Sequence, residues 1–187
     1  MTTLVSLMTH KDRLPNIYVE TVNGGEVWIN TTEGYGWAVE NAIRRALELG
    51  YNLVLADTDG YHPVCEINEL VERIDAVNPK SNVLIKPFRE NIGSQSFVFE
   101  KMFSLRFGRF LDPSGGLYAL SNSLLNILPE CTSPDMTVHI EILKNIFKLR
   151  RTRIIEIDQY SYTAGLNDKF NSKRTKNYQY KLFKTLL

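Results

Sequence analysis

The chain has few of the features that would place it among secreted, membrane-spanning or metal-cluster proteins. It holds only two cysteines, Cys65 and Cys131, and three histidines that are too scattered to form a metal cluster. No apolar run approaches the roughly 20 residues that a helix needs to cross a bilayer. The apolar run near the N-terminus is too short for a secretory signal. We therefore expect a cytoplasmic protein with reduced cysteines.

Most of the chain has no excess of positive or negative charge, and the formal net charge is +1. A balance of this kind gives no reason to expect binding to nucleic acid by charge alone. The C-terminal tail, residues 169–187, differs because it carries six Lys/Arg and no acid, with aromatics interleaved. One interpretation is a solvated helix or tail. The other is a peripheral contact with anionic lipid at the inner membrane face, or with a phosphate-bearing substrate.

Strand-like and helix-like segments alternate along the chain. Apolar spacing predicts a helix over 35–49, with Gly50 at its C-cap, and another after Pro63. Further helices are predicted over 95–110, over 121–128 with Ser121 as N-cap, and from Ser133 onward. The predicted strands are TLVSLMT, NIYVETV, EVWINT, YNLVLA, NVLIKPF, GGLYALS and TRIIEID. This order predicts one α/β domain over 1–187 with a largely parallel central sheet.

Two aspartates follow directly after the apolar strand YNLVLA, in the motif DTDG. In extended chain, residues i and i+2 point to the same side, so Asp57 and Asp59 would face one volume. Like charges that close repel unless a cation lies beside them. Mg²⁺ or Mn²⁺ would satisfy the pair, because Mg²⁺ takes one or two protein carboxylates and fills its other positions with water and substrate phosphate. The pair therefore suggests a diphosphate-bearing substrate.

Other interpretations of DTDG stay open. Asp and Gly after a strand are common turn formers, so the motif alone is compatible with an ordinary turn. It also resembles the nucleophile motif of haloacid-dehalogenase-type hydrolases, where the first aspartate attacks phosphorus. The chain lacks the acidic pair that such hydrolases carry on a later strand. A calcium loop is excluded because Tyr61 occupies its third ligand position.

Three segments together resemble the family-2 inverting glycosyltransferases of GT-A fold, especially the branch that uses polyprenyl or dolichol phosphate. NTTEGYGWAVENAIRRALELGYNLVLADTDGYHP is similar to that family's run of glycine loop, helix, strand and D-x-D, followed by H-P. LDPSGGLYALSNSLLNIL resembles its S-G segment, and RIIEIDQYSYTAGLNDK its last strand with T-A-G. The family's acidic D-D-G-S is replaced by VNGG at 22–25. The resemblance covers about residues 17–170 and implies a Rossmann-like, mixed, mostly parallel sheet flanked by helices.

This resemblance implies a donor, a metal ion and a reaction. The donor would be a nucleotide-diphosphate sugar, and the sugar would pass with inversion to a glycan, protein or lipid-phosphate acceptor. Mn²⁺ or Mg²⁺ would neutralise the departing diphosphate. Asp59 would be the leading metal ligand, and Asp57 would contact the ribose or a metal-bound water.

The resemblance also assigns roles to individual residues. Inverting transfer to a hydroxyl needs a general base, for which Asp135 is the first candidate and Glu141 the second. Asp135 could equally compensate a helix dipole, and a phosphate acceptor would need no base. Nucleotide-side candidates are Thr9, Glu20, Asn23, Gly34 and Gly36, and sugar- or acceptor-side candidates are Ser114, Gly115 and Gly116. The alternative function is a non-catalytic nucleotide-sugar-binding domain.

Overall fold

The computed structural model describes residues 2–9, 22–57, 62–89, 101–106 and 115–160, with the backbone alone for 88–89 and 158–160. Most of the predicted strand NIYVETV and the whole basic tail lie outside these residues. Three of the predicted site residues, Glu20, Asp59 and Ser114, lie outside them as well.

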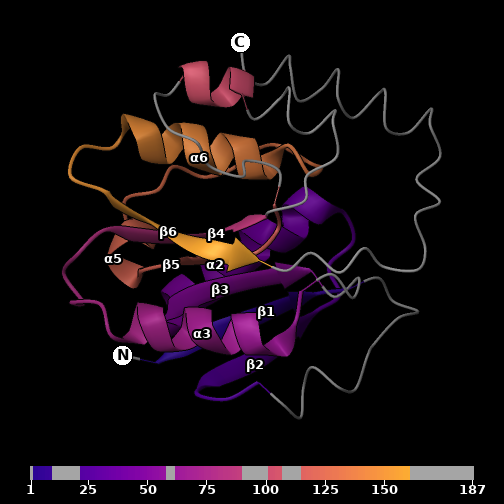
Figure 1. Cartoon of the computed structure of the whole chain (residues 1–187). Coiled ribbons are helices and arrows are strands. Elements are labelled where there is room, and N and C mark those ends of the chain that lie inside the picture. The colour runs from indigo at the N-terminus through magenta and orange to yellow at the C-terminus, as the bar shows by residue number, and fades with distance from the viewer. Residues whose placement is uncertain (1, 10–21, 58–61, 90–100, 107–114, 161–187) are drawn as a thin grey trace.

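Six strands in the described part of the chain form one mixed sheet (Figure 1). Their order across the sheet is β2-β1-β3-β5-β4-β6. Strand β5 runs antiparallel to both of its neighbours, and the other pairings are parallel. The strands are β1 (Thr3–Met8), β2 (Gly25–Asn30), β3 (Asn52–Asp57), β4 (Val83–Arg89), β5 (Tyr118–Leu120) and β6 (Arg153–Tyr160). The predicted mixed, mostly parallel sheet is thus confirmed.

Helices cover both faces of this sheet. Helices α2 (Tyr35–Leu49), α5 (Asn122–Leu125) and α6 (Val138–Lys148) share one apolar cluster with the sheet. Helix α3 (Val64–Asp75) contributes to the cluster on the opposite face and lies in front of the strands in Figure 1. A further helical segment spans 101–106.

The sequence located several helix ends correctly, although α5 ends at Leu125 and not at the predicted residue 128. Helix α2 has the predicted bounds, and Gly50 caps it in the left-handed region with φ 68°. Ser121 caps α5 by accepting a hydrogen bond from the backbone N–H of Leu124. Pro63 is the residue before α3 and lies outside its first turn.

Helix α6 begins at Val138, later than the predicted start at Ser133. Asp135 explains the delay, because its Oδ1 accepts hydrogen bonds from the backbone N–H and the hydroxyl of Thr137. A side chain that binds the backbone two residues ahead stabilises a turn in place of helix.

The core lies in two layers because side chains alternate along each strand. Leu53 and Leu55 of β3 join the cluster that α2 and α6 cover, whereas Val54 and Ala56 join the cluster under α3. All four are fully buried. A strand covered on both faces is apolar at every position, which is why YNLVLA reads as a continuous apolar run.

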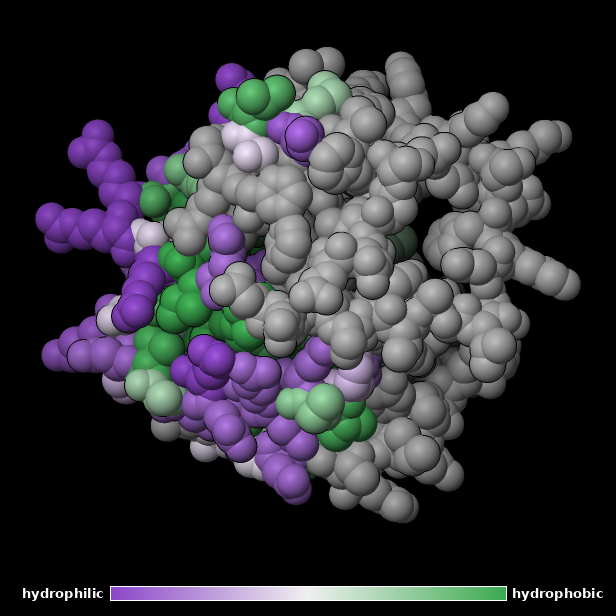
Figure 2. Space-filling model, in the orientation of Figure 1, coloured by the Kyte–Doolittle hydropathy of each residue, from purple (hydrophilic) through white to green (hydrophobic). Residues whose placement is uncertain are grey.

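On the face shown in Figure 2, apolar residues gather in one area that hydrophilic residues border. The exposed large apolar side chains of the described residues come from three separate segments; they are Trp37, Met102, Leu105 and Ile127. None of the helices in the described ranges has the length and apolar character needed to cross a membrane.

Candidate functional site

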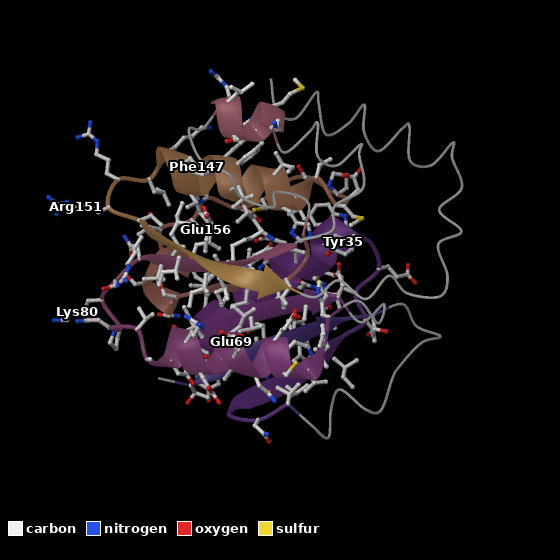
Figure 3. The ribbon with its side chains drawn as sticks, viewed as in Figure 1. Tyr35, Glu69, Lys80, Phe147, Arg151 and Glu156 are labelled. Carbon is white, nitrogen blue, oxygen red and sulfur yellow. The ribbon has the colours of Figure 1, made fainter. Side chains whose placement is uncertain are left out.

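The strand register brings several predicted site residues to one edge of the sheet. Met8 of β1 pairs with Asp57 of β3, so Thr9 and Asp57 lie at the carboxyl ends of neighbouring parallel strands. Since β5 runs in the opposite direction, the Gly115-Gly116 pair before it reaches the same edge. Open α/β sheets bind ligands at this edge. Figure 3 shows Tyr35, the first residue of α2, on the side toward which the β6 arrow points.

Asp57 accepts a hydrogen bond on one carboxylate oxygen, and its other oxygen lies close to Gly116. The hydroxyl of Tyr35 donates a hydrogen bond to Oδ1 at 2.6 Å. Oδ2 occupies the space that a side chain at position 116 would enter: a Cβ added to Gly116 would stand 2.8 Å from Cγ of Asp57 and 3.0 Å from the Tyr35 hydroxyl. The absence of a side chain at Gly116 is therefore what leaves room for the carboxylate.

A histidine and a second tyrosine stand behind Tyr35. Nε2 of His139, from α6, lies 2.8 Å from the Tyr35 hydroxyl, and its Nδ1 lies 2.9 Å from the hydroxyl of Tyr118. His139 is 1% exposed and Tyr118 3% exposed. Burial raises the pKa of Tyr118 well above its ordinary value of 10.0, and the charges of Cys131 and Asp57 raise it further. Tyr118 therefore stays protonated at any physiological pH.

A buried lysine, Lys86, binds the backbone around the Gly115-Gly116 pair. Lys86 of β4 is 2% exposed, and its Nζ donates to the carbonyl oxygens of Gly115 at 2.6 Å and Leu117 at 3.4 Å. Its ammonium also lies 5.0 Å from the centroid of the Tyr118 ring, within the range of a cation–π interaction. A buried lysine needs such partners, and here they fix the backbone that abuts Asp57.

The glycines at the start of α2 have different surroundings. Gly34, the N-cap residue, is exposed and has φ 88°, a conformation that favours glycine. Gly36 is buried against residues 133–134: its N–H donates to the carbonyl oxygen of Pro134 at 3.1 Å. A Cβ there would stand 2.7 Å from the carbonyl carbon of Pro134. The close approach at Gly36 is thus to the protein's own backbone, whereas the sequence suggested a nucleotide.

Both predicted base candidates make hydrogen bonds within the protein. Asp135 caps the turn before α6, as described above. Glu141 accepts hydrogen bonds from the backbone N–H groups of Thr132 and Ser133 and from the Thr132 hydroxyl. Partial burial alone would raise the pKa of Glu141, but the hydrogen bonds from Ser133 and Thr132 outweigh it and lower that pKa. These contacts fix the loop over the start of α2.

Asn23 is not brought to Asp57. It precedes β2, whose first residue Gly25 pairs with Thr3 at the amino end of β1. Its backbone N–H donates to Oδ1 of Asn68 in α3. Thr9, Gly115 and Gly116 do share the edge with Asp57.

Sequence reasoning missed four residues around Asp57: Tyr35, Lys86, Tyr118 and His139. One of them carried a usable signal, because His139 lies three and four residues before Ile142 and Leu143 on the buried stripe of α6. A polar side chain on a buried stripe requires hydrogen-bond partners. Tyr118 and Lys86 sit in apolar strand patterns, which do not reveal where a hydroxyl or an ammonium ends.

Comparisons with known proteins bear on the fold. No protein-family model matches the chain, and no curated protein matches it. Solved structures do match. Glucosyl-3-phosphoglycerate synthase from Mycobacterium tuberculosis, in complex with Mn²⁺, UDP-glucose and phosphoglyceric acid, is 17% identical with a TM-score of 0.69, over 100% of this chain and 78% of that one.

Two other structures give similar values. The same synthase with Mn²⁺, UDP-glucose and glycerol 3-phosphate has a TM-score of 0.68 at 17% identity, over 100% of this chain and 79% of that chain. A structure described as a mycobacterial protein has a TM-score of 0.67 at 18% identity, over 100% and 74%. The predicted GT-A-type fold is confirmed by this likeness. Identity this low shows the fold alone.

Proposed function

We propose that this chain is a metal-dependent glycosyltransferase that takes a sugar from a nucleotide-diphosphate sugar and transfers it with inversion. One observation carries the proposal: Asp57, the first aspartate of DTDG, ends a central strand of a GT-A-type sheet, accepts a hydrogen bond from Tyr35 and occupies space that Gly116 leaves open. The Mn²⁺ and UDP-glucose in the synthase complexes are consistent with the same ligand classes here.

The donor set fits a hard divalent ion. Carboxylate oxygens are the ligands that Mg²⁺ and Mn²⁺ prefer, and Mg²⁺ sites commonly use only one or two protein carboxylates. Among the described residues no group of three or more His, Cys, Asp or Glu could hold a metal ion, and Asp59 lies outside those residues. Asp59 would ligate the ion, and Asp57 would hold the ribose or a bound water. The ion would supply charge neutralisation for the departing diphosphate.

The chain's own residues would orient the substrates around this edge. Thr9 lies beside Asp57 on the nucleotide side, while Gly115 and Gly116 form a wall without side chains on the sugar or acceptor side. Asp135 would act as general base toward an acceptor hydroxyl, with Glu141 as second candidate. An acceptor phosphate, such as that of a polyprenyl phosphate, would need neither.

The second candidate function is a non-catalytic nucleotide-sugar-binding domain. A specific observation favours it: both base candidates already accept hydrogen bonds from neighbouring backbone and side chains. A carboxylate used in this way is a poorer proton acceptor. This alternative predicts that the donor binds without turnover, and that removing the charge of Asp135 leaves donor binding unchanged.

Release of nucleoside diphosphate tests the proposal. The chain is incubated with Mn²⁺ and UDP-, GDP- or dTDP-sugars, with phosphoglyceric acid, glycerol 3-phosphate or a polyprenyl phosphate as acceptor. We expect turnover with one pair, loss of at least about 100-fold in Asp59→Ala, and an inverted anomeric centre in the product by NMR. Glu69→Gln is the matched control, since that exposed carboxylate pairs only with a surface arginine in the contacts described, Arg73. No turnover with any donor, or full activity in Asp59→Ala, would refute the proposal.

A further inference from the structure

Four polar side chains from four different elements form a continuous chain of contacts behind the candidate site. Asp57 of β3, Tyr35 of α2, His139 of α6 and Tyr118 of β5 are joined by hydrogen bonds of 2.6, 2.8 and 2.9 Å. These elements have no sequence continuity with one another. Tyr35 and Tyr118 meet at the imidazole ring of His139, and Tyr35 continues the chain to Asp57, so the fold is what brings these side chains together.

The hydrogens of this chain can be assigned from the chemistry of the groups. An ionised carboxylate only accepts, so Tyr35 gives its single hydroxyl proton to Asp57. Tyr35 must then accept from Nε2 of His139, which therefore carries the ring proton. We assign the neutral ring to His139, in which Nδ1 is the acceptor and the hydroxyl of Tyr118 is its donor. Every donor in the chain thus points toward Asp57.

The chain is rigid as well as directional. The His139 ring packs edge-on against both tyrosine rings, with centroids 5.2 Å from Tyr35 and 5.4 Å from Tyr118. Lys86 lies over the Tyr118 ring and also holds the Gly115 carbonyl. Lys86 therefore contacts both Tyr118, the donor farthest from Asp57, and the backbone of the glycine pair. Hydrogen bonds in series polarise one another, which strengthens the final bond to the carboxylate.

We propose that His139 is a positioning residue for Asp57: through Tyr35 it fixes the rotation of the carboxylate and so the direction in which it meets the metal–nucleotide complex. This role rests on the proposed function. It assigns His139 no contact with substrate. Partners that orient the carboxylates of a metal site contribute 10–100-fold in metal affinity or activity in known proteins.

The test measures binding of Mn²⁺ in the presence of UDP by electron paramagnetic resonance, together with KM and kcat for the best donor. Tyr35→Phe and His139→Gln should each weaken Mn²⁺ binding about 10- to 100-fold. Tyr118→Phe keeps the ring and removes only the distant hydroxyl, and it should weaken binding in the same direction by a smaller factor. Tyr51→Phe is the control, because Tyr51 lies at the amino end of β3, away from Asp57.

A second readout does not depend on activity. ¹⁵N NMR of the imidazoles should show His139 as the neutral Nε2–H tautomer, and Tyr118→Phe should shift its Nδ1 signal. If the wild-type chain binds Mn²⁺ and UDP but all three variants bind as tightly, the positioning role is wrong and the proposed function stands. An Nδ1–H tautomer would equally overturn it. A wild-type chain that binds neither ligand overturns the proposed function and the positioning role together.

Discussion

Replacing Gly116 by alanine is the smallest change that should disable the candidate site. The new Cβ would stand 2.8 Å from Cγ of Asp57 and 3.0 Å from the hydroxyl of Tyr35. Carbon atoms in favourable contact are about 3.5–4.0 Å apart, so the carboxylate must retreat by about 1 Å or the strand must shift. The backbone of Gly116 is not in the left-handed region, so the effect is steric and not conformational.

Two magnitudes follow from this displacement. A misplacement of about 1 Å in a catalytic group costs roughly 100-fold in rate, so kcat/KM of Gly116→Ala should fall by about that factor. Overpacking of a filled site costs about 1–3 kcal/mol, and each kcal/mol lowers Tm by about 2–4 °C in a chain of this size. The assay is nucleoside diphosphate release beside a thermal melt.

Gly50→Ala supplies the control that separates stability from site geometry. Gly50 caps α2 with φ 68° and has no atom within 4 Å of an added Cβ. An alanine there carries only the cost of left-handed backbone, about 1–2 kcal/mol, and should leave kcat/KM unchanged. The reasoning is refuted if Gly116→Ala retains wild-type kcat/KM and Mn²⁺ affinity, or if Gly50→Ala loses activity to the same extent.

Three further predictions concern the loop and helix beside the site. Asp135→Asn keeps a side-chain oxygen that accepts hydrogen bonds from Thr137, but this amide oxygen cannot serve as a base. If Asp135 is the base, kcat should fall at least about 100-fold with Tm unchanged. Equal activity would mean that Asp135 only caps the turn before α6. The pKa of Glu141 is lowered from 4.5 on folding, so its charge stabilises the fold above that pH. The difference in Tm between wild type and Glu141→Gln should therefore shrink as the pH falls below about 4.5. Burial, together with neighbouring carboxylates that include Glu141, raises the pKa of Cys131 to about 12. A thiol reagent at pH 8 should therefore modify only the exposed Cys65 in the native chain, and both cysteines in urea. Rapid modification of both cysteines in the native chain would contradict this prediction.

Local signals in the sequence were sufficient for most of the fold. The period of apolar residues and the glycine at position 50 located α2, since both act within one helix. The start of α6 was misplaced because an aspartate two residues before Thr137 competes with the helix for its backbone. That competition is decided by a side-chain rotamer, which apolar periodicity does not report.

The candidate site was predictable only in part, for a different reason. Asp57 could be found because it stands at the end of an apolar strand, and Gly116 because it belongs to a recognisable motif. Tyr35 binds Asp57, 22 residues further along the chain, and His139 contacts Tyr35 across 104 residues. Contacts of that range depend on how α2 and α6 are laid on the sheet. The sequence of one chain leaves that arrangement open.

The reversed direction of β5 has a consequence for how this protein tolerates change in length. In a wholly parallel sheet, the chain reaches the ligand edge only on leaving a strand; here it also reaches that edge on entering one, through Gly115-Gly116. Residues inserted just before β5 would displace the Gly115-Gly116 pair that lies beside Asp57. Residues added beyond α5, in the turn near Asn126, would emerge at the far rim of the sheet, where linkers or tags could be inserted with the site left intact.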